Sequence, residues 1–563
     1  MNSILKIKNF KNLDFIKPKF LKNTFILNSL ISIFIGSFSF IFIYGTKAFT
    51  IFPKAFNDND YLIYQASYYV FRGQQWNFPI FNSNKLFLQK EVNLILADYI
   101  PIYSIFLKFL ENTLNIQFKN FLIFWIYLST IFMFYISYKL FLHLDLSKTE
   151  STIGAFVISY LPASHFKFLY HSGEGSHFLI ILGIYLYLKS KHKTRYIYQL
   201  GIITGLSLWV HFYIFTFLFG IYFIALINYK KKKLVILKTV SIFTIIASTI
   251  FILSFGSINS FKYIVENNIS SEFNPRWSAE FNSFFCSKIS NNLIFNVFKC
   301  YEPYTNTDIE SYGYLGLGII LFLPILFFKF KENLSIVKSN KNLIFLSLIY
   351  LIFAFGNRFK ISHKQIFEYQ FTDLHLKLIK IYRAHGRFIY LFYYLLIFLV
   401  LYNIFKISKN SKLKYLVVIL FLLVQIVDLN HQYLNSSFNS FKYEIEHKDF
   451  QNIETITRKN VASRLFIYPL DNCFEDFDMF FFAKEFLKIG GSINGSRIRG
   501  GSNLINCQES NIYSSLFEYD PVHFIITENE YLKFEEKILE NYSCQIFKGY
   551  FKNTNFLYCS FNF

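Results

Sequence analysis

Residues 24–46 read TFILNSLISIFIGSFSFIFIYGT, an apolar stretch without a charged residue. A helix needs about 20 apolar residues to cross a lipid bilayer, and this stretch is long enough. Six lysines precede it, from Lys6 to Lys22, and basic residues beside a span stay on the cytoplasmic side. No small-residue cleavage site follows it, so the segment predicts an anchor with a cytoplasmic N-terminus rather than a removed signal peptide.

The composition of the whole chain is also that of a membrane protein. Of 563 residues, 53% are hydrophobic, with 75 Phe and 41 Tyr, and only 17% are charged. A soluble protein spreads its charges over the surface, whereas a membrane protein confines them to its loops. The net charge of +21 would suggest nucleic-acid binding in a soluble protein. Here the lysines gather beside apolar segments, so we expect no nucleic-acid partner.

Further apolar segments predict eleven membrane-spanning helices in all, counting the first. The other segments lie near residues 119–142, 151–169, 176–189, 197–212, 213–229, 234–256, 313–330, 342–356, 387–406 and 414–430. Residues 99–111 are too short to span and predict a helix that lies at the membrane interface. We therefore expect a polytopic α-helical membrane protein.

The charges between these segments predict the orientation of the chain. With the N-terminus inside, the cytoplasmic loops should lie near residues 143–150, 190–196, 230–233, 331–341 and 407–413. All but the first of these loops carry clusters of Lys and Arg at or beside them, as the positive-inside rule requires. An odd number of spans places the C-terminal part of the chain outside the cytoplasm.

The chain divides into two predicted domains. Residues 1–430 form a multi-span transmembrane domain with external loops at 48–98 and 257–312, and residues 431–563 have a composition closer to that of soluble proteins. The runs SRLFIYPL (463–470) and VHFIITEN (522–529) alternate as strands do, around a predicted helix at 475–488. We expect an extracytoplasmic α+β domain of ordinary size.

Cysteine placement agrees with this topology. None of the six cysteines lies in a predicted span, and all fall on the predicted external side: Cys286, Cys300, Cys473, Cys507, Cys544 and Cys559. In an oxidising compartment they could form three disulfides. The pairing stays open, since the four cysteines of the last domain alone allow three connectivities.

The first external loop carries carboxylates close to the membrane. Asp58 and Asp60 stand at its start, and Asp98 stands at its end, three residues before Pro101. A carboxylate beside a cavity could act as a general base or hold a divalent cation, and Asp60 is the stronger candidate. The alternative is structural, because Asn and Asp before a helix are ordinary N-caps.

A second polar stretch lies at the outer end of a predicted span. His171, Glu174 and His177 occur within seven residues, interrupted by two glycines that argue against one rigid helical face. Ionisable residues at the membrane boundary often mark functional positions. A polar loop that lines a cavity is the favoured interpretation, and a zinc site is the alternative. His211 also falls at an outer helix end, where His commonly just sits at the interface.

Two arginines precede a predicted span on its outer side. Arg383 and Arg387 are four residues apart, so on a helix they would share a face and could clamp a phosphate. Binding to lipid headgroups is the alternative. Arg72 and Arg276 are weaker candidates for the same role.

In order along the chain, these segments resemble an uncharacterised bacterial family of polytopic membrane proteins, domain of unknown function 6311. The resemblance rests on Asp60 to Arg72, Trp76 to Pro79, Asp98 to Pro101, His171 to His177, Arg383 to Phe388, Gln425 to Asp428, and Cys473, Asn494, Arg497, Cys507, Cys544 and Cys559. It spans nearly the whole chain and implies the inner (cytoplasmic) membrane of a bacterium.

The layout in turn resembles the C-type (GT-C) fold of glycosyltransferases that use lipid-phosphate sugars. That resemblance implies transfer of a sugar from a polyprenyl-phosphate donor to an extracytoplasmic glycan or protein acceptor. Asp60 would be the catalytic base or would help to hold a divalent cation. The substrate-binding residues would be Arg383, Arg387, Asp98, His171, Glu174, His177, His211 and Trp76.

Two other classes of function stay open. A transporter or flippase of a lipid or polysaccharide intermediate would usually show paired repeats and mid-membrane charges, whereas we find no repeat in this sequence. A non-catalytic protein of envelope assembly would use the external domain as a binding module. An outer-leaflet cavity lined by Asp60 and Arg383 would favour the enzyme.

Overall fold

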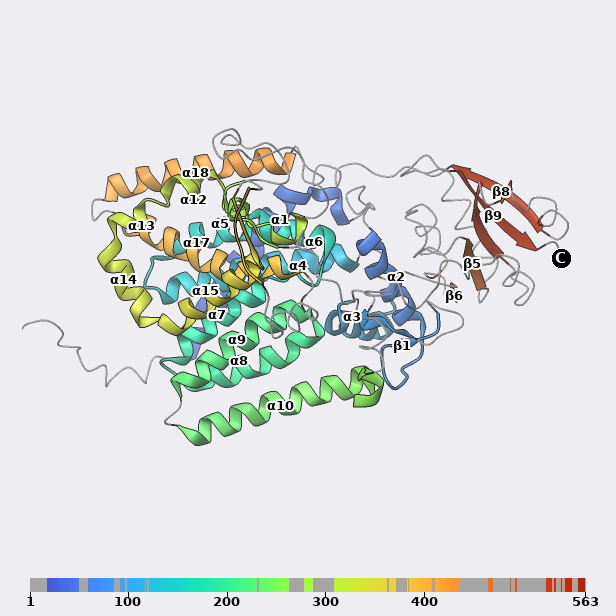
Figure 1. Cartoon of the computed structure of the whole chain (residues 1–563). Coiled ribbons are helices and arrows are strands. Elements are labelled where there is room, and N and C mark those ends of the chain that lie inside the picture. Colours follow the sequence, from blue (N-terminus) through green and yellow to red (C-terminus); the bar gives the residue numbers. More distant parts are fainter. Residues whose placement is uncertain are drawn as a thin grey trace, which may run out of the picture.

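The computed structural model shows a bundle of helices and a small sheet of C-terminal strands (Figure 1). It describes residues 18–49, 59–85, 92–96, 99–116, 118, 121–229, 232–262, 278–286, 308–361, 364–370, 382, 384–407, 411–434, 464–468, 487, 492–493, 523–528, 531–532, 538, 542–548 and 555–561.

Each of the predicted spans falls on helical residues. The helices are α1 (Pro18–Tyr44), α2 (Asn59–Gly73), α3 (Pro101–Leu114), α4 (Phe121–His143), α5 (Lys148–Ser159), α6 (Pro162–Tyr170), α7 (Phe178–Ser190), α8 (Arg195–Leu206), α9 (Phe212–Asn228), α10 (Lys233–Phe255), α12 (Leu317–Phe322), α13 (Ile325–Phe328), α14 (Phe330–Ser339), α15 (Lys341–Phe355), α17 (Tyr390–Phe405) and α18 (Ser411–Leu434). Short 3-10 helices include η4 (Ser207–Trp209), η6 (Phe281–Phe284), η7 (Asp308–Ser311) and η8 (His385–Ile389).

Within the described residues, five helical segments are long and apolar enough to cross a membrane: Ile26–Tyr44, Phe121–His143, Lys233–Phe255, His385–Phe405 and Lys412–Asn430. A sixth is counted if α14 and α15, which meet at 93°, form one broken span. Three further apolar helices are shorter: α7, α9 and the pair α12–α13. The protein is therefore a helical membrane protein with five or six candidate spans.

Prolines divide two of the predicted spans. The segment at 151–169 is two helices, because α6 begins at Pro162, which lacks the N–H that would continue α5. The segment at 313–330 is likewise broken before Pro324 into α12 and α13. These breaks leave helices that are shorter than the apolar stretches that encode them.

Helix α10 lies along the edge of the bundle beside α8 (Figure 1). Two glycines of α8, four residues apart, make the contact. A Cβ on Gly205 would lie 2.7 Å from the Ile246 side chain, and one on Gly201 would lie 3.3 Å from Thr239. Small residues at this spacing let helix backbones approach closely in a membrane, where no hydrophobic driving force joins helices.

We expect Gly205→Ala to destabilise the protein by about 1 kcal/mol or more, because the added methyl group forces α10 away from α8. The control is Gly73→Ala, where the nearest atom to the new Cβ would be the Lys85 Nζ at 3.8 Å. Thermal unfolding of the purified protein in detergent measures both changes. Equal melting temperatures for the two variants would refute the role of Gly205.

The loop between α1 and α3 is hydrogen-bonded to the end of α10. Asn93 donates from Nδ2 to the Ser254 carbonyl oxygen at 2.6 Å, and the Ile80 N–H donates to the Leu253 carbonyl oxygen at 3.0 Å. The Trp209 indole N–H donates to the Ser254 Oγ at 2.8 Å. The bonds from Asn93 and Ile80 satisfy carbonyl groups that the end of a helix leaves without intrahelical partners.

Helix α3 has the amphipathic pattern expected of residues 99–111. It spans Pro101–Leu114, with Phe106 and Phe109 exposed and Leu107 and Lys108 buried. At 14 residues it is too short to cross a bilayer. An exposed apolar face of this kind, here formed by Phe106 and Phe109, is typical of helices that lie at a membrane interface.

Side chains of α18 cap the N-terminal end of α12. Asp428 Oδ2 accepts hydrogen bonds from the Leu317 N–H at 2.9 Å and the Tyr314 hydroxyl at 2.8 Å. Gln425 Oε1 accepts from the Ile319 N–H at 3.0 Å, and Gln425 Nε2 donates to the Leu315 carbonyl oxygen at 3.0 Å. The first turn of α12 therefore finds its hydrogen-bond partners on a neighbouring helix.

The C-terminal strands form one mixed five-stranded sheet in the order β6-β5-β7-β9-β8. The strands are β5 (Arg464–Tyr468), β6 (Ser492–Ile493), β7 (His523–Thr527), β8 (Tyr542–Lys548) and β9 (Asn555–Phe561). Strand β5 is parallel to β6 and β7, whereas β9 is antiparallel to β7 and β8. The two predicted strands correspond to β5 and β7, and the helix predicted at 475–488 lies almost wholly outside the described residues.

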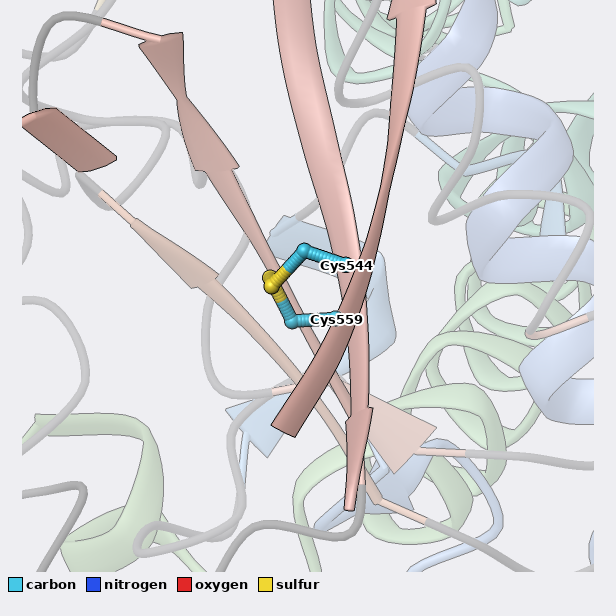
Figure 2. Close-up of a disulfide and its surroundings, with 2 residues drawn as sticks. All are labelled: Cys544 and Cys559. Atoms are coloured by element: carbon cyan, nitrogen blue, oxygen red, sulfur yellow. A yellow bond between two sulfur atoms is a disulfide. The ribbon is translucent and has the colours of Figure 1, made fainter. Parts of the chain in front are cut away.

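A disulfide between Cys544 and Cys559 joins β8 to β9 (Figure 2). The two cysteines are directly opposite each other in the antiparallel register. Cys286 is also disulfide-bonded, while Cys300, Cys473 and Cys507 lie outside the described residues.

Candidate functional site

Five ionisable side chains meet in the helical bundle: Lys167, His171, Glu174, Glu310 and Arg387. Lys167 lies on α6, and His171 and Glu174 lie in the turn between α6 and α7. Glu310 comes from η7, and Arg387 comes from η8, at the entrance to α17. We call these five residues the charge cluster.

Arg387 is at the centre of the charge cluster. Its Nε lies 2.6 Å from Glu310 Oε2 and its Nη2 lies 2.7 Å from Glu310 Oε1, which is a two-pronged ion pair. Its third nitrogen, Nη1, lies 3.0 Å from Glu174 Oε2. The guanidinium also stands over the Tyr213 ring, with 4.7 Å between the guanidinium carbon and the ring centre. Two carboxylates therefore take up both sides of the guanidinium.

Lys167 connects the same two carboxylates. Its Nζ lies 2.8 Å from Glu310 Oε2 and 3.4 Å from Glu174 Oε1. His171 Nε2 lies 3.6 Å from Glu310 Oε1. Among the described residues, the positive charges of Lys167 and Arg387 balance the negative charges of Glu174 and Glu310. That balance is what lets Lys167 and Arg387 be buried so fully, because an unpaired charge in a medium of low dielectric constant is very costly.

The surroundings of Glu310 keep its carboxyl group ionised. Burial by itself would raise the pKa of this group, but the positive charges of Arg387 and Lys167 outweigh burial and hold the pKa well below its ordinary value. Glu310 therefore acts as an anion and an acceptor of hydrogen bonds in this state. It is a poor general base while both cations contact it.

Two glycines allow the turn that carries His171 and Glu174 to pack closely. A Cβ on Gly175 would lie 2.4 Å from the Phe168 ring, and a Cβ on Gly173 would lie 2.9 Å from the Val210 carbonyl oxygen. The glycines that interrupt this polar stretch thus serve the packing of the turn rather than a helical face. They bring Glu174 within reach of α6 and η8.

The sequence profile of domain of unknown function 6311 matches residues 33–430, over half of the chain. The chain belongs to this family. The matched domain contains the charge cluster and the Gln425–Asp428 contact with α12. A search of the curated proteins finds no match to the chain.

Three residues predicted for one site do come together in this family domain: His171, Glu174 and Arg387. Lys167 and Glu310 also belong to the charge cluster, although neither was predicted as a site residue. Lys167 had a signal, because it is an ionisable residue inside a predicted span, which is a functional position by default. Glu310 had none, since it is one of several acidic residues in a polar loop.

The other predicted histidines serve neighbouring helices. His177 contacts α17, where its Nδ1 lies 2.9 Å from the Tyr394 hydroxyl and its ring lies 4.2 Å from the Tyr390 ring. His211 caps α9, because its Nδ1 accepts a hydrogen bond from the Tyr213 N–H at 3.3 Å. These contacts account for both side chains structurally.

Trp76 follows α2 in the loop at residues 48–98 and contacts residues of α2 and α3. Its side chain is 51% exposed, and the Lys108 ammonium stands 4.4 Å from its ring centre. Burial lowers the pKa of Lys108 to about 8, and its Nζ donates to the Phe71 carbonyl oxygen at 2.8 Å. Arg72 pairs with Glu111 at 3.9 Å and so belongs to this region as well.

The remaining predicted site residues are not located. Asp98, Arg276 and Arg383 lie outside the described residues, and Asp60 lies in α2 with its side chain outside them. The structure therefore does not test the role of Asp60 as a base, nor a joint clamp by Arg383 and Arg387.

The donor atoms of His171, Glu174 and Glu310 all lie within 4.8 Å of one another, as the ligands of a metal ion do. One imidazole and two carboxylates would suit a divalent cation. However, Lys167 and Arg387 already neutralise both carboxylates. A divalent cation would have to displace these two positive charges, so the geometry favours an ion-pair network over a metal centre.

Proposed function

We propose that this protein is a membrane glycosyltransferase of GT-C-like architecture, which transfers a sugar from a polyprenyl-phosphate donor to an extracytoplasmic acceptor. In this proposal all eleven apolar segments span the inner membrane, the N-terminus is cytoplasmic, and the C-terminal domain lies outside. The observation that carries it is the charge cluster, where two buried cations, two carboxylates and an imidazole meet in a membrane domain.

The chemistry of the reaction calls for such a set of groups. A sugar on a polyprenyl phosphate already has a good leaving group, so the enzyme must orient an acceptor hydroxyl, accept its proton and stabilise the departing phosphate. Arg387 and Lys167 would stabilise the phosphate, and Arg383 would assist them. Asp60 or His171 would accept the proton, and Trp76 would stack on the sugar ring.

A transporter or flippase of a lipid intermediate is the alternative that a specific observation favours. Balanced buried ion pairs between helices can also serve to couple ion and substrate movement. A non-catalytic assembly protein would need no such cluster, because burying four charges lowers stability and binding a partner does not require it.

We expect Lys167→Met and Asp60→Asn to reduce the amount of transferred sugar in cells by about 100-fold or more, because each removes a group that acts in the transition state. Mass spectrometry of lipid-linked sugars and envelope glycans measures the change, with immunoblots to match protein levels. The control is Glu332→Gln, since Glu332 is exposed and pairs only with Lys329 in the described structure.

The profile of lipid-linked sugars and glycans distinguishes a glycosyltransferase from a flippase. If the protein is an enzyme, an inactive variant should accumulate the donor lipid that carries the sugar. If it is a flippase, an inactive variant should retain the lipid intermediate on the cytoplasmic face of membrane vesicles. Unchanged glycan and lipid profiles in both variants, at wild-type protein levels, would rule out the proposed glycosyltransferase.

A further inference from the structure

We propose that the Glu310 carboxylate is an internal substitute for a substrate phosphodiester, which displaces it from Arg387 and Lys167 on binding. This exchange would explain how the site selects a phosphodiester ligand. That the ligand is a lipid rests on the proposed function.

The geometry of the Glu310 contacts is the geometry that a phosphate group would adopt. Arg387 grips both oxygens of Glu310 with Nε and Nη2, at 2.6 and 2.7 Å. The planar fork of a guanidinium matches two oxygens of a carboxylate or of a phosphate equally well. Lys167 adds a point charge 2.8 Å from one of these oxygens, as lysines in phosphate sites do.

Of the two carboxylates, Glu310 is the one that can leave. The Glu174 side chain is 1% exposed and is held in the close-packed turn between α6 and α7. The Glu310 side chain is 15% exposed. It also faces His171, the other member of the cluster with some exposure. A ligand that approaches from this side therefore meets Glu310 first.

The charge balance selects the kind of phosphate. Among the described residues, the charges of Lys167 and Arg387 balance those of Glu174 and Glu310 while Glu310 is in place. Removing the Glu310 carboxylate leaves one net positive charge. A phosphodiester carries one negative charge and restores neutrality, whereas a dianionic phosphomonoester leaves a net negative charge. Because net charge is costly in a buried site, the cluster should prefer a diester, which is the form of a lipid-phosphate sugar.

The exchange can be tested by equilibrium binding to the purified full-length protein in detergent. The probes are the methyl ester of farnesyl phosphate, which is a phosphodiester, farnesyl phosphate, which is a monoester, and farnesol, which has no charge. We expect the wild-type protein to bind the diester at least tenfold more tightly than farnesol. We expect Glu310→Gln to bind the diester at least tenfold more tightly than the wild type, because a neutral amide competes poorly for Arg387.

Matched variants separate competition from general damage. Lys167→Met should bind the diester at least tenfold more weakly, and Glu332→Gln should bind it as the wild type does. Glu310→Asp, which keeps the charge on a shorter side chain, should bind somewhat more tightly than the wild type. If Glu310→Gln does not fold, Glu310→Asp decides the question by the same criterion.

An affinity of Glu310→Gln for the diester equal to or weaker than that of the wild type would overturn the exchange. Tighter binding of the diester by Glu310→Gln, with unchanged glycan and lipid profiles in cells that carry Lys167→Met or Asp60→Asn, would support the exchange and remove the proposed glycosyltransferase. Loss of transferred sugar in cells that carry Lys167→Met or Asp60→Asn, with an unchanged affinity of Glu310→Gln for the diester, would leave the proposed glycosyltransferase and remove the exchange.

Discussion

Replacing Arg387 by Leu is expected to lower the free energy of unfolding by about 3–5 kcal/mol, because it leaves a buried carboxylate without a compensating charge. Glu174 and Glu310 would then share the single cation Lys167. The two-pronged contact between Arg387 and Glu310 would also be lost. Denaturant or thermal unfolding of the protein in detergent measures this loss.

The control for Arg387 is an ion pair of the same chemistry at the surface. Arg358 Nε lies 2.8 Å from Glu368 Oε1 between β3 (Arg358–Ile361) and β4 (Lys364–Glu368), where the side chains are 38% and 39% exposed. We expect Arg358→Leu to change stability by about 0–1 kcal/mol. If both variants unfolded alike, the Arg387 ion pairs would contribute no more than a surface contact.

A double variant distinguishes charge imbalance from lost packing. Arg387→Leu together with Glu310→Leu removes one charge of each sign and leaves Lys167 paired with Glu174. We expect this protein to be more stable than Arg387→Leu alone, because the uncompensated carboxylate is gone. A double variant that is less stable than the single one would point to packing instead.

Replacing Asp428 by Ala is expected to lower the free energy of unfolding by about 2–4 kcal/mol, since two buried donors lose the carboxylate that accepts from them, at about 1–3 kcal/mol each. The donors are the Leu317 N–H and the Tyr314 hydroxyl. Asp428→Asn keeps one carbonyl oxygen in the same place and should cost less. Thermal unfolding in detergent compares the two, and an Ala variant as stable as the Asn variant would contradict this role of Asp428.

The same contact gives a physical role to a motif that belongs to the family resemblance. Gln425 and Asp428 are three residues apart, so they share one face of α18. Their side chains reach the backbone around Gly316 and Gly318, where an added Cβ would lie 2.1 and 2.7 Å from atoms of Gln425. Polar residues in this span thus stabilise the junction between α18 and α12.

The sequence by itself determined the class of the protein and the positions of its helices. A bilayer admits spanning segments only if every backbone polar group is bonded within the segment or its neighbours. Long apolar stretches such as 24–46 therefore specify helices locally. The strands at 464–468 and 523–527 also follow from local alternation. The helix breaks before Pro162 and at Pro324 did not follow from the apolar stretches, because the effect of a proline on a helix depends on what packs beside it.

Only the tertiary structure decided which polar residues form a site. Lys167 and Glu310 are 143 residues apart in sequence, and Glu310 and Arg387 are 77 apart. No spacing rule connects such positions, since their proximity depends on how α6, η7 and η8 pack. The sequence could predict that His171, Glu174 and Arg387 lie at helix ends. It could not show that two carboxylates hold Arg387, because that arrangement is set by the balance of buried charges in the folded chain.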